Sequence, residues 1–154
     1  MEELSVRIVQ LVPMRVASAY GFGPSPELVA WATLLEWAKA GGLLDVEPAP
    51  RFFGFNNPDP TPGSPNYGYE QWMTVGADVA GSGGVTIKEF IGGLYAVTRC
   101  DGIQTITDTW HRLATWCEGS PYVIGQHQYL EECFTPDAVR LEDYVFDLYL
   151  PIVE

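Results

Sequence analysis

The alternation of apolar and polar positions divides the chain into short strands and helices. Segments of strand length, rich in β-branched and aromatic residues and bounded by turn signals, lie at 6–12, 15–20, 51–55, 67–75, 85–91, 93–100, 127–134 and 144–153. Two further segments, 26–40 and 105–118, carry apolar side chains at helical spacing. The first helix has Ser25 as its N-cap and Pro26 at its first position, and Gly41 ends it.

The two halves of the chain repeat one pattern. Two tryptophans and a leucine of the first helix, and a glycine that precedes it, recur 79 positions later (110 − 31), as the pairs Gly23/Gly102, Trp31/Trp110, Leu34/Leu113 and Trp37/Trp116. The same offset aligns 52–55 with 131–134, whereas 69–72 aligns with 146–149 at an offset of 77. We therefore predict one α+β domain over 1–154, with strand–helix–strand–strand modules at about 6–80 and 85–154. Antiparallel sheets would carry the helices on one side, and a ligand groove would lie between the modules.

Alternation along the strands assigns side chains to faces. Along 127–134, Tyr129 and Glu131 share one face and Glu132 lies on the other. In the last strand of each half, a mixed set opposes the apolar positions, namely Glu70, Trp72, Asp147 and Tyr149. Aromatic rings attract cations and a carboxylate neutralises their charge, so this composition suits a flat, partly cationic organic molecule.

Charge and cysteine content narrow the function. Eight Lys and Arg stand against 20 Asp and Glu, which gives a formal net charge of −12. This balance argues against nucleic-acid binding and would attract cations, although on charge alone the better explanation is that acidity simply keeps the protein soluble. The three cysteines form no CxxC pair, so neither a disulfide framework nor a metal site is expected. No signal peptide, membrane span or cofactor motif is recognisable, and we expect a cytoplasmic protein without a cofactor.

Several of these residues together resemble a known family. The elements are the run 92–97, Gly102, Trp110-x-x-Leu113-x-x-Trp116, Tyr129-Leu130-Glu131 and Leu150-Pro151-Ile152, with a weaker match at 53–58. In order and spacing they resemble the GyrI-like small-molecule-binding domain, the effector-binding domain of AraC- and MerR-type multidrug regulators, which also occurs alone. The resemblance implies two fused modules, a groove between them and a lipophilic, often cationic ligand.

The resemblance also implies a site. Glu131 stands where the family has its groove glutamate, and Cys133 stands where the family often has tyrosine. The candidate ligand-binding residues are Glu131, Glu70, Trp72, Tyr129, Tyr149, Trp110 and Phe52. The alternative is structural: aromatic residues on strands mostly pack, Trp110 lies on an apolar helix stripe, and a glutamate can sit at a solvated edge, which Glu132 fits better.

Two functional hypotheses remain open on the sequence. In the first, the chain binds hydrophobic, planar or cationic small molecules for drug sensing or sequestration. In the second, suggested by stand-alone family members that resemble hydrolases of cyclopropane-bearing alkylators, Glu131 is a general base that activates water against a strained ring. The oligomeric state stays open as well.

Overall fold

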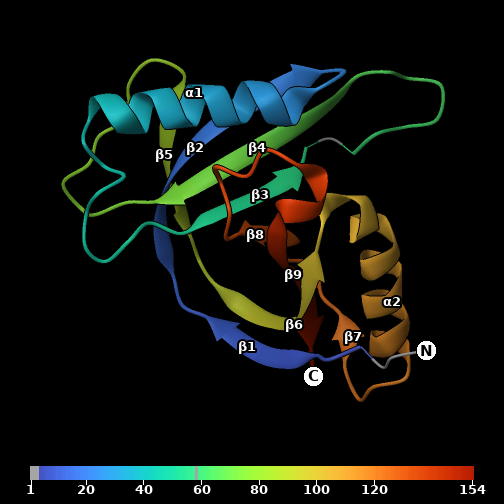
Figure 1. Cartoon of the computed structure of the whole chain (residues 1–154). Helices are drawn as coiled ribbons and strands as arrows, with labels where there is room; N and C mark the ends of the chain where they lie inside the picture. Colours follow the sequence, from blue (N-terminus) through green and yellow to red (C-terminus); the bar gives the residue numbers. More distant parts are fainter. Residues whose placement is uncertain (1–3, 58) are drawn as a thin grey trace. The chain divides into compact units, whose positions relative to one another are not determined.

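The computed structural model describes residues 4–57 and 59–154, so Pro58 of the run 53–58 lies outside the described residues. The chain forms two compact units. The central unit is Met14–Phe90, and the terminal unit combines the described residues up to Pro13 with Ile91–Glu154. Each unit carries an antiparallel sheet and a helix (Figure 1), and the predicted α+β class is confirmed.

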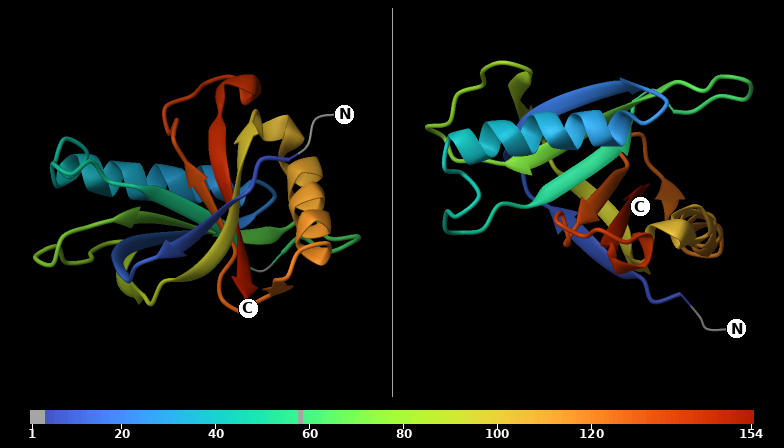
Figure 2. Two further views of the ribbon diagram at one scale, coloured as in Figure 1. Left: turned by 90° about the horizontal axis from the view of Figure 1, so that it is seen from below. Right: turned by 45° about the horizontal axis from the view of Figure 1, so that its top comes forward.

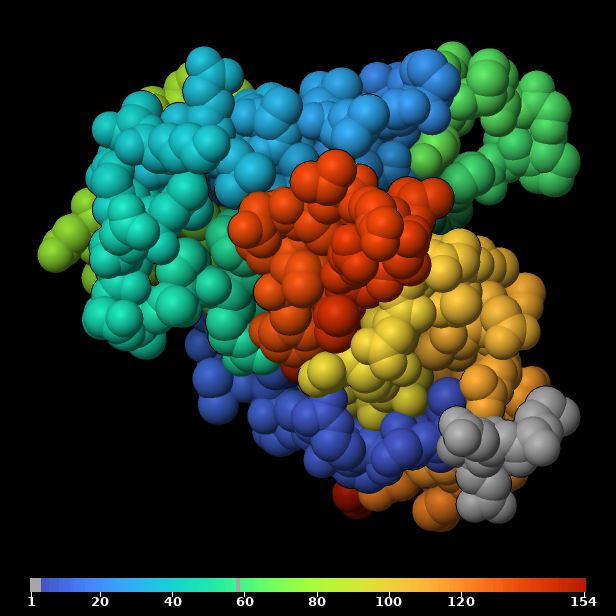
Figure 3. Space-filling model, viewed as in Figure 1, coloured from blue at the N-terminus to red at the C-terminus, as the bar shows by residue number. Residues whose placement is uncertain are grey.

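In the central unit, β2 (Met14–Gly23), β3 (Phe52–Asn56), β4 (Tyr67–Thr74) and β5 (Val85–Phe90) pair in the order β3-β4-β2-β5. Helix α1 (Pro26–Ala40) packs against β2 and β4 and buries Leu34 against the sheet. Gly21 allows this contact, because a Cβ there would collide with the backbone of Pro26. The exposed loop 59–66 projects away from the strands that it joins (Figure 3).

The terminal unit contains β1 (Arg7–Leu11), β6 (Gly93–Asp101), β8 (Leu130–Cys133) and β9 (Val145–Val153) in the order β1-β6-β9-β8. The short β7 (Val123–Ile124) pairs with the end of β9. Helix α2 (Ile106–Glu118) follows the short helix Ile103–Thr105 and lies beside β6 (Figure 2), and a second short helix spans Leu141–Asp143. The core of the terminal unit includes Leu113, Leu148 and Ile152, which are all fully buried.

The units differ from the predicted modules in one strand each. β1, expected in the first module, pairs with β6, and β5, expected in the second, pairs with β2. Alternation shows that a segment is a strand, but it does not identify the neighbouring strand. Each unit therefore takes an edge strand from the other half of the sequence.

The repeat is visible in the pattern of burial. From Met14 along β2 and from Gly93 along β6, buried, half-buried and exposed side chains follow in the same order. Three of the four buried residues of α1 also recur 79 positions later in α2, as Ala30, Leu34 and Ala38 in α1 and Thr109, Leu113 and Cys117 in α2. Equivalent positions in β2 and β6, and in the middle of α1 and α2, therefore have equivalent environments.

The strand register corrects the alignment of the third strands. Phe55 pairs with Glu70, and Glu132 pairs with Asp147, so β3 aligns with β8 at an offset of 77 and not 79. The connection from helix to third strand is thus two residues shorter in the terminal unit. By this register Phe52 is equivalent to Tyr129, and Gly54 is equivalent to Glu131.

Candidate functional site

Three of the predicted residues come together in the terminal unit. Glu131 pairs with Leu148 and projects from β8 toward α2, where Trp110 Nε1 donates a hydrogen bond of 3.0 Å to its Oε2. The rings of Trp110 and Tyr129 are 5.9 Å apart between centroids. Glu131 is half-buried and Tyr129 is 42% exposed, so the carboxylate and both rings form a partly open cluster.

The central unit has the same aromatic pair but no carboxylate. Trp31 and Phe52, equivalent to Trp110 and Tyr129, have ring centroids 5.4 Å apart. At the position of Glu131 stands Gly54, where an added Cβ would collide with the hydroxyl and ring of Tyr69. Phe52 itself is 7% exposed. The ring of Tyr69 thus fills the space that Glu131 occupies in the terminal unit.

Tyr149 lies on the opposite face of the terminal sheet from Glu131. Its hydroxyl donates a hydrogen bond of 2.7 Å to Oε1 of Glu132. Both side chains lie with Asp147 on this opposite face, and all three are buried. The prediction that Tyr149 and Glu131 face one site is therefore wrong, since the register pairs Glu131 with Leu148. The interpretation of Glu132 as a solvated edge residue is also wrong, because only 3% of Glu132 is exposed.

Asp147 is held by two arginines. Its carboxylate accepts hydrogen bonds of 2.6 Å from Arg7 Nη2 and 2.8 Å from Arg99 Nε. The hydrogen bond to Asp147 raises the pKa of Arg99 above its ordinary value. These two ion pairs link β1, β6 and β9, which gives Asp147 a structural role.

Glu70 and Trp72 form a separate cluster in the central unit, on the face that points away from α1. Oε2 of Glu70 accepts hydrogen bonds from Ser18 Oγ (2.8 Å), Trp72 Nε1 (2.6 Å) and Lys88 Nζ (2.7 Å). Burial raises the pKa of Glu70, but the hydrogen bonds from Lys88, Trp72 and Ser18 outweigh this effect, so its pKa lies below the ordinary value. Glu70 already has a cation as its partner and is 4% exposed, which favours a structural role.

Trp72 is packed between two aromatic rings. Its ring centroid lies 5.0 Å from that of Phe55 and 5.4 Å from that of Phe90.

The sequence pattern missed the cationic partners of the buried carboxylates Glu70 and Asp147, which are Lys88, Arg7 and Arg99. The repeat could have indicated them, because Glu70 and Asp147 occupy equivalent positions and a buried carboxylate needs a cation or several donors.

Cys133, at the position where the family pattern often has tyrosine, is buried. Burial raises the pKa of its thiol, so it is a weak nucleophile at neutral pH. Within residues 4–57 and 59–154, no group of three or more His, Cys, Asp or Glu side chains could hold a metal ion. Over the same residues, none of the helices has the length and apolar character that crossing a bilayer requires.

The model of the GyrI-like small molecule binding domain matches residues 4–153. The chain belongs to the GyrI-like family. Among curated proteins, none matches its sequence. The groove between the two modules stays a prediction.

Solved structures share the GyrI-like fold at low sequence identity. EcmrR in its complex with DNA matches with a TM-score of 0.75 at 13% identity; the match covers 97% of this chain but 57% of the EcmrR chain. A hydrolase from Listeria innocua matches with a TM-score of 0.67 at 13% identity, over 99% of this chain and 94% of that one. SAV2435 bound to tetraphenylphosphonium matches with a TM-score of 0.58 at 11% identity, over 97% and 94%. These similarities establish the fold.

Proposed function

We propose that the chain binds lipophilic, planar or cationic small molecules at the cluster of Trp110, Tyr129 and Glu131. The observation that carries the proposal is a half-buried carboxylate hydrogen-bonded to one aromatic side chain, which in turn lies beside a second, exposed ring. A cation over an aromatic face gains about 0.5–1 kcal/mol at an exposed site and about 2 kcal/mol when it is desolvated, and a carboxylate adds charge neutralisation. The N–H of Trp110 fixes the orientation of the carboxylate before the ligand arrives.

Charge and fold support a cationic ligand. The net charge of −12 attracts cations to the protein in general, and Glu131 gives them one defined position. SAV2435, which shares the fold, is bound to tetraphenylphosphonium, a cation with an apolar surface. Because Gly54 replaces the carboxylate in the central unit, we expect one such site per chain.

A second candidate function is ring-opening hydrolysis at the same cluster. Its support is that a protein of the same fold is a hydrolase. Glu131 would remove a proton from water as the water oxygen bonds to a strained ring carbon. The ring bond to that carbon would break, and the hydroxyl of Tyr129 would donate a hydrogen bond to the phenolate or alkoxide oxygen that takes up the electron pair. The general base must return its proton to the product or to solvent before the next cycle.

One experiment separates the two functions. The protein is incubated with tetraphenylphosphonium and, in parallel, with a cyclopropane-bearing alkylator, while tryptophan fluorescence and product are followed. Binding predicts saturable quenching without product. Hydrolysis predicts several turnovers per chain that are lost in Glu131→Gln. Glu118 is an exposed residue on α2, so Glu118→Gln is the matched control for the change in charge. If the wild type shows neither quenching nor product, the proposal is refuted.

A further inference from the structure

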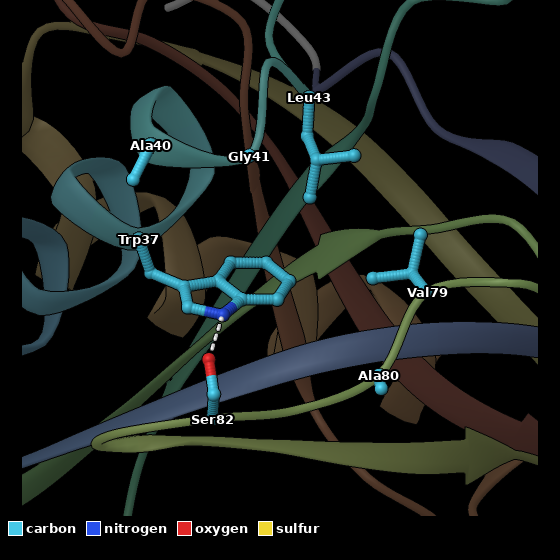
Figure 4. A pocket seen from close by; sticks show the side chains of 7 residues that line it. All are labelled: Trp37, Ala40, Gly41, Leu43, Val79, Ala80 and Ser82. Atoms are coloured by element: carbon cyan, nitrogen blue, oxygen red, sulfur yellow. Dashed lines mark hydrogen bonds between the residues drawn. The ribbon is translucent and has the colours of Figure 1, made fainter.

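The central unit contains an open trough. Residues 43–49, which follow α1, run beside 74–79, which follow β4, and a cavity of about 440 Å³ lies between them. It adjoins a second cavity of about 400 Å³ under the indole of Trp37, since Leu43 and Val79 line both. Figure 4 shows the side chains of Trp37, Leu43 and Val79 converging on this space. We name the two cavities together the Trp37 trough.

The walls of the Trp37 trough are held by hydrogen bonds. Arg15 donates to the carbonyls of Gly76 (3.2 Å) and Val79 (2.8 Å) and so fixes one wall. On the other side, Leu43 N donates to Ala38 O at 2.9 Å, a helix ending that requires the positive φ of Gly42 (+67°). Trp37 Nε1 donates to Ser82 Oγ at 3.1 Å, which fixes the indole plane. The trough is therefore preformed.

The internal repeat shows that this opening is particular to the central unit. In the terminal unit, the connection after α2 forms β7, which pairs with Ile152 and Val153. At the offset of 77, these two residues are equivalent to Val75 and Gly76, which line the trough. The terminal unit thus closes this position with a strand pair, whereas the central unit leaves a cavity.

The lining specifies the chemistry of a ligand. Leu43, Val46 and Val79 present apolar surface, and the indole of Trp37 offers a face for a cation. Glu47 and Asp78 are the ionisable residues of the lining, and both are exposed carboxylates. The C-terminal end of α1, at Ala40 and Gly41, also lines the trough and adds partial negative charge. All these features favour a positive charge attached to an apolar body.

We propose that the Trp37 trough is a second binding site, which takes small organic cations carrying an apolar chain, such as an alkyltrimethylammonium ion. The cavity volumes suit a ligand of this size. The site is independent of Glu131, so the proposal does not depend on the proposed function.

The test is a titration with hexyltrimethylammonium, followed by the indole N–H signals of the 15N-labelled protein, with the Trp37 signal assigned through Trp37→Phe. We expect the Trp37 signal to shift saturably. Removing the two carboxylates in Glu47→Gln/Asp78→Asn should weaken binding about five-fold, as two partly exposed charge interactions allow. Hexanol and hexanoate should shift the signal at much higher concentration. The control Asp108→Asn/Glu118→Gln removes the same charge from exposed positions of α2 and should leave the affinity unchanged.

Three results would overturn the proposal: an unshifted Trp37 signal, equal affinities for the cation and hexanol, or equal losses in the two double variants. Glu131→Gln separates this site from the cluster on β8. It should keep the Trp37 response, and loss of that response would mean that the two sites are not independent.

Discussion

Gly54 and Glu131 occupy equivalent positions in the two units, because Gly54 pairs with Gln71 in β4 and Glu131 pairs with Leu148 in β9. These two positions have different roles. At Gly54 the ring of Tyr69 packs closely against the backbone, whereas Glu131 presents a carboxylate that accepts a hydrogen bond from the N–H of Trp110.

Gly54→Ala tests the close packing in the central unit. The added methyl group would collide with Tyr69, so we expect the free energy of unfolding to fall by about 1–3 kcal/mol. Urea unfolding measures this change. Gly76→Ala is the control, because a Cβ at Gly76 meets nothing within 4 Å. Equal losses in the two variants would contradict the packing described for Tyr69.

The helices and most strands were predictable because their periodicity and end signals are local. Ser25, Pro26 and Gly41 mark α1, and the alternation in 93–100 and 144–153 gives β6 and β9. The partners of β1 and β5 were not predictable, since an alternating segment has the same pattern beside any neighbour. The two-residue shift of β8 was hidden for a different reason: it lies in the connection that follows each helix, and the two connections share no sequence pattern that would align them.

The predicted site was only partly recovered. Tyr129 and Glu131 were placed on one face from alternation, and both contact Trp110. Tyr149 was misplaced because a face assignment made on one strand transfers to its neighbour only when the register is known. The ion pairs of Glu70 and Asp147 join strands distant in sequence, so composition alone could not reveal them.

Glu70 makes stability depend on pH in the acid range. Its pKa is lower in the folded protein than in the unfolded chain, so its contribution is complete above the unfolded value of about 4.5 and is lost as the pH falls through the folded value. Glu70→Gln should therefore reduce the free energy of unfolding at pH 7, and the difference from wild type should shrink toward pH 3. Urea unfolding at both pH values measures this. A difference that stays constant would show that the charge of Glu70 is not responsible.

Asp147→Asn tests the charge cluster of the terminal unit. The substitution leaves the guanidinium groups of Arg7 and Arg99 without their shared counter-charge, so we expect a loss of about 1–3 kcal/mol in unfolding free energy. Arg140→Met removes exposed ion pairs to Glu142 and Asp143 and should change stability by less than about 0.5 kcal/mol. If Asp147→Asn is as mild as the control, Asp147 does not tie the strands together.

The central claim is that Glu131 and the two aromatic side chains beside it form the ligand site of this GyrI-like protein. Calorimetric titration of tetraphenylphosphonium into the wild type, Glu131→Gln and Glu118→Gln tests it most directly. We expect saturable binding to the wild type, an affinity about ten-fold lower in Glu131→Gln, as loss of a partly buried charge interaction implies, and wild-type affinity in Glu118→Gln. Wild-type affinity in Glu131→Gln, or no binding to the wild type, would contradict the account.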